Sequence, residues 1–264
     1  MGVAPKPIVS LELGEEQVVR VLGSIDFICN GEFRSVLARA VDKGSKVTID
    51  LSRAESLDSS AVHTLSSACK RAQALGVRFA VTGANEGILR VLQVSGLATM
   101  LGLSVLTLKS DEPEADKPDL RRQEWRITES VILADAEVIG SLRDLGLYAA
   151  LESEIDDQSI AEIRVALTEA LANALQHGSP EPGKSKIILR CLSCPKAFVI
   201  EVMDAGPGIS QPTPDDSGSL LNEAGLGLRL MHAMMDEVEF RLSGNGGFVR
   251  MLKWLRDDYQ DLEV

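Results

Sequence analysis

The stretch EIRVALTEALANALQHG, residues 162–178, decides the fold of the second half of the chain. Its apolar side chains recur every three or four residues and fall on one stripe, at Ile163, Ala166, Leu167, Ala170 and Ala174. This spacing predicts an amphipathic helix over 157–177. Gly178 is placed to end the helix, because glycine is common just past a helix C-terminus.

Three polar residues of the same stretch share a second face. Glu169, Asn173 and His177 are spaced four residues apart, and at about 100° per residue they turn only about 80° around the helix, opposite the apolar stripe. One interpretation is the solvated face of an amphipathic helix. The other is a nucleotide site, in which an Asn oxygen binds Mg²⁺ and a Glu accepts a proton or orients a hydroxyl.

A glycine-containing turn follows the apolar strand predicted at Val199–Met203. The turn reads DAGPGI, residues 204–209. Asp204 at the strand end can accept a hydrogen bond from an exocyclic amine, and Gly206 and Gly208 allow backbone to approach a flat ligand. The turn therefore suits a base-binding site.

A second glycine element, GLGL at 225–228, opens a predicted helix. Free N–H groups and the positive dipole end at a helix N-terminus suit phosphate. The polar segment 210–224 between the two elements is long enough to be a lid. Each element alone is weak, but their order after the Glu/Asn/His helix strengthens the nucleotide interpretation.

Together these motifs resemble the GHKL ATP-binding fold shared by histidine kinases, type II topoisomerases and Hsp90. The continuation LRLMHAMMDEVEF at 228–240 resembles the anti-sigma serine-kinase branch. The resemblance covers about residues 125–255. It implies an α/β sandwich with a mixed sheet covered by helices on one face.

The resemblance also implies residue roles. Asn173 is expected as the Mg²⁺ ligand and Glu169 as the catalytic base. Asp204 is expected at the adenine amine. The remaining nucleotide contacts are expected at His177, Gly206, Gly208, Gly225 and Gly227. One departure is the last hairpin turn, GNGGF at 244–248, which lacks the threonine that family members often carry near the adenine.

A linker separates this region from the first part of the chain. Residues 109–124 read KSDEPEADKPDLRRQE, with two prolines, many charges and no apolar periodicity. The sequence thus predicts domains at 1–108 and 125–264. In the first, strand patterns alternate with helical patterns, which indicates an α/β layer structure. The strands are expected at 18–22, 47–51, 78–82 and 105–108, and the helices at about 30–43, 60–75 and 85–95.

The first domain resembles the STAS domain of anti-sigma factor antagonists. The motifs are LGSID at 22–26 and DLSRAESLDSSAVHTL at 50–65, and the match spans about residues 8–108. By resemblance Ser59 is the phosphoacceptor, and Ala61 replaces the usual glycine. From the local sequence alone, one of Ser59 and Ser60 is explained more simply as the N-cap of a helix.

Composition limits the partners and the compartment. The net charge is −12 and the pI about 4.8, without the basic patch of a nucleic-acid binder. No apolar run at the N-terminus indicates a signal peptide or a membrane span. Cys191 and Cys194 form a lone CxxC without a second ligand pair, which disfavours zinc. We expect a cytoplasmic protein.

The main hypothesis is a partner-switching regulator. An ATP- and Mg²⁺-dependent kinase domain phosphorylates a STAS serine, either Ser59 or that of another protein, and so controls an anti-sigma factor and its sigma factor. A homodimer is expected by resemblance. A sensor histidine kinase is disfavoured, because no histidine lies on a dimerising helix before the ATP domain and His63 lies inside the first domain. Two alternatives stay open: a nucleotide-gated binding module with STAS as an intramolecular plug, and a phosphatase-regulated adaptor without a sigma factor.

Overall fold

The computed structural model describes residues 8–12, 16–103, 120, 123–153, 155–181, 183–206, 225–243 and 246–255. The chain divides into two compact units. Of the described residues, the first unit holds those up to 103 and 225–230, and the second holds those from 120 to 206 and from 231 to 255. The division runs inside one helix, and each unit is described by itself.

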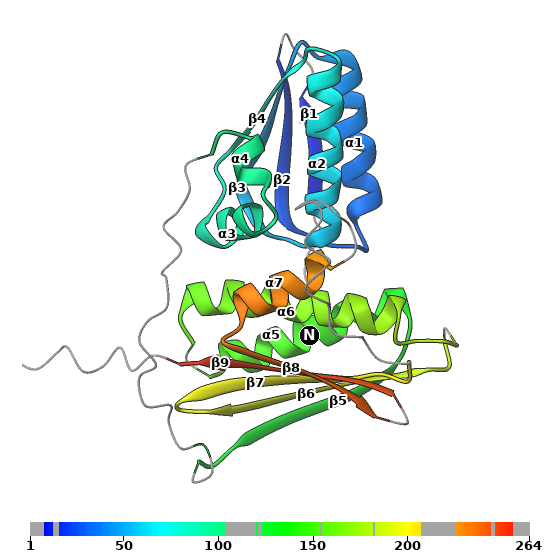
Figure 1. Ribbon diagram of the computed structural model, residues 1–264, viewed down its shortest axis with the longest axis vertical. Helices are drawn as coiled ribbons and strands as arrows, with labels where there is room; N and C mark the ends of the chain where they lie inside the picture. The colour runs from blue at the N-terminus through cyan, green and yellow to red at the C-terminus, as the bar shows by residue number, and fades with distance from the viewer. Residues whose placement is uncertain are drawn as a thin grey trace, which may run out of the picture. The chain divides into compact units, whose positions relative to one another are not determined.

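The first unit is an α/β layer structure (Figure 1). Its four strands lie in the order β1 (Ile8–Glu12), β2 (Gln17–Ile25), β3 (Lys46–Leu57) and β4 (Arg78–Thr82). The β1–β2 pair is antiparallel, whereas β2–β3 and β3–β4 are parallel. The helices are α1 (Asn30–Lys43), α2 (Ser59–Ala74), α3 (Glu86–Val94) and α4 (Leu97–Met100). Single helices join the parallel strands, as a crossover connection requires.

The second unit has a five-stranded sheet in the order β5-β6-β7-β9-β8. The strands are β5 (Arg126–Leu133), β6 (Lys186–Cys194), β7 (Ala197–Met203), β8 (Glu237–Ser243) and β9 (Gly246–Trp254). Helices α5 (Ala136–Leu151) and α6 (Asp157–Gln176) cover one face of it (Figure 1). Helix α7 (Leu226–Met234) precedes β8. The α/β fold class predicted for both parts is confirmed.

The mixed sheet predicted for this unit is wrong in one detail, because every pair in it is antiparallel. Two helices join β5 to β6, and the second returns the chain to the end where β5 finished. The single helix α7 does make β8 run in the direction of β7, but β9 lies between them and pairs antiparallel with both.

Most predicted elements lie within a few residues of the observed ones. Strand β1 was not predicted, and the strand expected at 105–108 lies outside the described residues. So does most of the expected linker, and the domain boundaries at 108 and 125 stay a prediction. Among the described helices, none combines the length and the apolar character that crossing a membrane requires.

Candidate functional site

Helix α6 and its C-cap carry three of the predicted site residues at different depths. Its start is fixed by Asp156, whose carboxylate accepts a hydrogen bond from the backbone N–H of Ser159 at 2.9 Å. Glu169 is buried, with 2% of its surface exposed, whereas Asn173 is half-buried and His177, the C-cap residue, is exposed. The interpretation of these three residues as one solvated face is therefore wrong at Glu169. The sequence could not show this, because α6 is covered on almost all sides by the rest of the unit.

Asp204 lies directly after β7 and is held by two backbone donors. Its Oδ1 accepts hydrogen bonds from the N–H of Gly206 at 2.8 Å and from the N–H of Gly247 at 3.2 Å. Within the part of the chain that the structure describes, both of these bonds end on Oδ1. Oδ2 can therefore accept a hydrogen bond from a ligand.

Four glycines surround Asp204 at close range. A Cβ on Gly178 would overlap the Asp204 carboxylate, and one on Gly246 would overlap the Asp204 carbonyl. A Cβ on Gly247 would lie 2.9 Å from both carboxylate oxygens, and one on Gly206 only 2.5 Å from the Cα of Gly178. Sequence reasoning treated Gly178 as a helix end and Gly247 as part of a turn. Only the fold brings both to Asp204.

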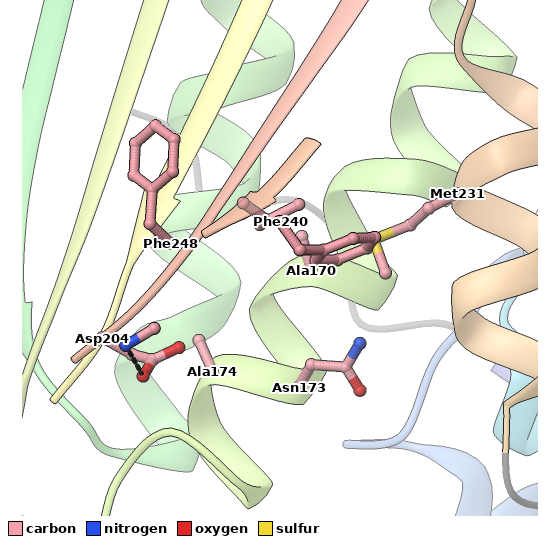
Figure 2. Close-up of a pocket in the computed structure, with 9 residues that line it drawn as sticks. Ala170, Asn173, Ala174, Asp204, Met231, Phe240 and Phe248 are labelled. Carbon is pink, nitrogen blue, oxygen red and sulfur yellow. Dashed lines mark hydrogen bonds between the residues drawn. The ribbon is translucent and has the colours of Figure 1, made fainter. Parts of the chain in front are cut away.

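A small cavity joins Asp204 to α6. It is lined by Ala170, Asn173, Ala174, Asp204, Met231, Phe240, Gly247, Phe248 and Val249. In Figure 2 Asn173 projects from α6 on one side and Asp204 lies on the other, with its bond to Gly247 dashed. The cavity has about 20 Å³ of free space, which is about the room of one water molecule.

The other predicted residues of this site fall into two groups. Gly208 and the expected lid at 210–224 lie outside the described residues. Gly225, with φ of 96°, precedes α7, and Gly227 is in its first turn. Both belong by contacts to the first unit. The structure thus brings Asn173 and Asp204 to one cavity, while the roles of Gly225 and Gly227 stay predictions.

The predicted phosphoacceptor Ser59 is the first residue of α2, and the N-cap of this helix is Asp58. Asp58 Oδ1 accepts hydrogen bonds from the N–H of Ala61 at 2.9 Å and from the hydroxyl of Ser60 at 2.7 Å, and Oδ2 accepts one from the N–H of Phe27 at 2.7 Å. The interpretation of either serine as the N-cap is therefore wrong. The Ser60 hydroxyl donates its hydrogen bond to the capping residue Asp58. Ser59 is half-buried at the positive end of the helix.

Asp58 is almost completely buried, and a second buried carboxylate, Asp26, lies nearby. Asp26 Oδ1 accepts hydrogen bonds from the N–H groups of Ile28 at 3.0 Å and Cys29 at 3.2 Å. Burial raises the pKa of Asp58 to about 6, against the opposite effect of its hydrogen bonds to Ala61 and Ser60. The start of α2 is thus an acidic, tightly bonded corner.

The CxxC pair does not form a shared site. Cys191 faces the helices beside Gly146, whereas Cys194 packs with Val199 and Leu252 on the opposite face of the sheet. Residues three apart in a strand point to opposite sides, so the two thiols cannot hold one metal ion. Burial also raises the pKa of Cys191 to about 12.

Comparison with known proteins agrees with this fold. The family model of the histidine kinase-like ATPase domain matches residues 133–253, and that of the STAS domain matches residues 11–115. The chain therefore combines a STAS domain with a histidine kinase-like ATPase domain, which is the composition of a partner-switching regulator.

Individual relatives narrow the family to which the second domain belongs. The chain is 30% identical to a serine-protein kinase RsbW of Bacillus velezensis over 50% of its own length and 88% of that protein. It is 33% identical to an anti-sigma F factor of a Thermoanaerobacter species over 42% of its length and 83% of that protein. The chain belongs to the family of RsbW and anti-sigma F factor.

Among solved structures, an anti-sigma factor antagonist from Mycobacterium paratuberculosis is 23% identical, with a TM-score of 0.36, over 39% of this chain and 91% of that one.

Proposed function

We propose that the second domain is an ATP-dependent kinase that phosphorylates a serine of a STAS domain, either Ser59 of this chain or the matching serine of a partner. The observation that carries the proposal is the Asp204 carboxylate. One of its oxygens is fixed by two backbone N–H groups, and Asp204 lines the cavity shared with Asn173. This is the arrangement that an exocyclic amine needs.

In the proposed complex, Asp204 Oδ2 accepts a hydrogen bond from the adenine amine. The side chains of Ala170, Met231 and Phe240 give the cavity apolar walls for a flat base. Because the free space is only about 20 Å³, these walls separate when the base enters. Met231 on α7 is an unbranched side chain and adapts its shape easily.

The Asn173 amide fits a magnesium site. It is half-buried at the edge of the cavity, and Mg²⁺ takes oxygen ligands, often one or two from the protein, with the rest from water and phosphates. Bound Mg²⁺ would neutralise charge on the β- and γ-phosphates. Asn173 is therefore the proposed ligand.

Glu169 is the proposed base, one helical turn before Asn173. In the transfer, the serine Oγ forms a bond to the γ-phosphorus while the bond from this phosphorus to the bridging oxygen breaks. The serine proton passes to the Glu169 carboxylate, and ADP leaves with the bridging oxygen. We further propose His177, Gly206 and Gly208 around the nucleotide, with Gly225 and Gly227 at the phosphates.

Phosphate on Ser59 would act through charge. It adds about −1.5 to −2 charges beside the buried carboxylates of Asp58 and Asp26, so the phosphorylated corner repels an acidic docking surface. The kinase domain would then exchange its STAS partner for another protein, proposed to be a sigma factor. We propose a cytoplasmic setting, without direct contact to nucleic acid or membrane.

Incubation of the purified chain with labelled ATP and Mg²⁺ tests the proposal. We expect label on Ser59 or on an added STAS protein, no label on the chain itself in Ser59→Ala, and none anywhere in Asn173→Ala. Ser60→Ala is the matched control and should keep Ser59 as the labelled residue. Wild-type protein that binds ATP but labels neither itself nor a STAS partner would exclude the kinase.

That last result would favour the binding-only alternative, in which ATP gates binding and STAS acts as an intramolecular regulator. The feature in its favour is the hairpin turn at 244–248, which lacks the threonine expected near the adenine.

A second copy of the chain is the proposed partner for the helix-free face of the second sheet. This face carries the exposed apolar side chains of Ile127 (58%), Val131 (49%) and Leu133 (51%) on the edge strand β5. A row of charges crosses the same face and pairs within the sheet. Its members in strand order are Glu129, Arg190, Glu201, Arg250 and Glu239.

Charge favours a second copy at this face. Arg190 contacts Glu129 at 2.6 Å and Glu201 at 3.4 Å, and the three glutamates and two arginines of the row leave a net charge of only −1. Two chains of net charge −12 repel each other least where such a face meets another. In sedimentation, we expect Val131→Glu to convert a wild-type dimer into a monomer and Leu151→Glu, at a more exposed apolar residue on α5, to leave the dimer intact. A monomeric wild-type chain would exclude the dimer.

A further inference from the structure

A buried ion pair joins three elements of the second unit away from the cavity. Lys253 on β9 is only 8% exposed and Glu162 on α6 only 2%. The Lys253 ammonium donates a hydrogen bond to Glu162 Oε2 and another, at 3.0 Å, to the carbonyl of Met234, the last residue of α7. One ammonium group thus contacts α6 and the end of α7 at the same time.

Neighbouring contacts hold the pair in place on both sides. Gln158 donates a hydrogen bond to Glu162 Oε1 at 3.1 Å. Asp236, just past α7, accepts a hydrogen bond from the N–H of Trp254 at 2.7 Å and donates its own N–H to the carbonyl of Leu252 at 2.9 Å. The end of α7 is therefore attached to β9 before and after Lys253.

Stability alone does not explain a charged pair at this position. Lys253 lies on the helix-facing side of β9 with Val249 and Met251, both buried. Removing two charges from water is costly, and apolar residues of similar size often stabilise a protein equally or better. A buried pair can instead select one arrangement of its neighbours, because the charges are satisfied only there.

The arrangement selected here includes the nucleotide cavity. Glu162 precedes Glu169 by seven residues and Asn173 by eleven, so each of the two lies within about 20° of Glu162 on one side of α6. Met231, which lines the cavity, lies one turn before Met234 on α7. β9 begins with Gly246 and Gly247, which contact Asp204.

We propose that Lys253 and Glu162 are positioning residues, which fix the end of α7 against the side of α6 that carries Glu169 and Asn173 and so set the shape of the nucleotide cavity. The inference rests on the proposed ATP site, but the contact between Lys253 and α7 can be tested without nucleotide.

The decisive variant replaces both charges, as Glu162→Leu with Lys253→Met. Lys253→Met alone leaves a buried carboxylate without its cation and is expected to unfold more easily. The double variant should unfold at or above the wild-type midpoint, because no buried charge is left unpaired. If the pair positions α7, the double variant binds ATP at least tenfold more weakly despite this stability. If the pair serves stability alone, ATP affinity returns with stability.

Hydrogen exchange in the nucleotide-free protein gives the second readout. We expect faster exchange of the amides at 232–235 in the double variant than in wild type. The matched control is Glu181→Leu with Lys184→Met, which removes an exposed ion pair and should change neither exchange there nor ATP affinity.

The outcomes separate the two proposals. Unchanged exchange at 232–235, or wild-type ATP affinity in the double variant, overturns the positioning role. Wild-type chain that binds no ATP overturns the proposed function, while the exchange measurement still decides whether Lys253 holds α7.

Discussion

Two aspartates that each follow a strand behave differently in this molecule. Asp58 comes directly after β3 and Asp204 directly after β7, and each accepts hydrogen bonds from two backbone N–H groups. Asp58 uses both carboxylate oxygens for these bonds and also accepts one from the Ser60 hydroxyl. Its side chain is buried. Asp204 takes both bonds on one oxygen and lines a cavity.

The difference separates a structural carboxylate from a candidate ligand-binding one. The oxygens of Asp58 are already used to hold the start of α2 to the loop after β2. Asp204 is held firmly by Oδ1, while Oδ2 can accept a further hydrogen bond. Substitutions of the two residues should therefore affect different measurements, with Asp204 governing nucleotide binding and Asp58 governing stability.

The largest expected effect is on ATP binding in Asp204→Asn. The amide keeps an oxygen for the N–H groups of Gly206 and Gly247, but it presents an NH₂ group to the adenine amine. We expect ATP affinity to fall by about a hundredfold, or about 2.7 kcal/mol, with the free energy of unfolding changed by less than about 1 kcal/mol. Calorimetric titration and urea unfolding measure the two. Unchanged ATP affinity would show that Asp204 is not part of the nucleotide site.

The mirror experiment is Asp58→Asn. The N–H of Phe27 loses its acceptor in a buried place, which should lower the free energy of unfolding by about 1–3 kcal/mol at pH 5. ATP affinity of the second domain should stay within about twofold of wild type, a change of about 0.4 kcal/mol. A large loss of ATP affinity with unchanged stability would reverse the assignment of the two aspartates.

A smaller effect is expected from crowding Asp204. Gly178→Ala places a Cβ against the Asp204 carboxylate and should displace this carboxylate. We therefore expect ATP binding to weaken about tenfold, or by about 1.4 kcal/mol. The control is Gly31→Ala in α1, where a Cβ meets nothing within 4 Å. Equal ATP affinity in both variants would show that ATP binding does not depend on the position of the Asp204 carboxylate.

The smallest effect concerns pH. Burial raises the pKa of Asp58 to about 6 from 3.8, so between these values the folded state holds a proton that the unfolded chain has lost. Stability from this proton is present at low pH and is lost as pH rises through about 6. Between pH 5 and pH 7 wild type should lose about 1 kcal/mol relative to Asp58→Asn. Urea unfolding at both pH values measures this, and a constant difference would contradict it.

The sequence predicted the parts of this account that depend on local pattern. The apolar stripe around Leu167 was enough to place α6, and the strand ending at Met203 was enough to place Asp204. The DSS motif at 58–60 located the start of α2, although its cap is Asp58 instead of a serine.

Contacts between distant residues could not be predicted in this way. Gly178 and Gly247 meet Asp204 only because α6, β7 and β9 come together in the folded unit. The burial of Glu169 depends on what packs around α6, which helical periodicity does not show. The fully antiparallel sheet was not predicted, because it depends on β9 lying between β7 and β8, which the local sequence does not show.

Hydrogen exchange of the full chain, with and without ATP and Mg²⁺, tests most directly whether nucleotide occupies the cavity at Asp204. We predict slower exchange at Gly206, at Gly247 and along α6 around Asn173 when ATP is present. Saturating ATP that slows exchange elsewhere, and leaves these three places unchanged, would contradict the account.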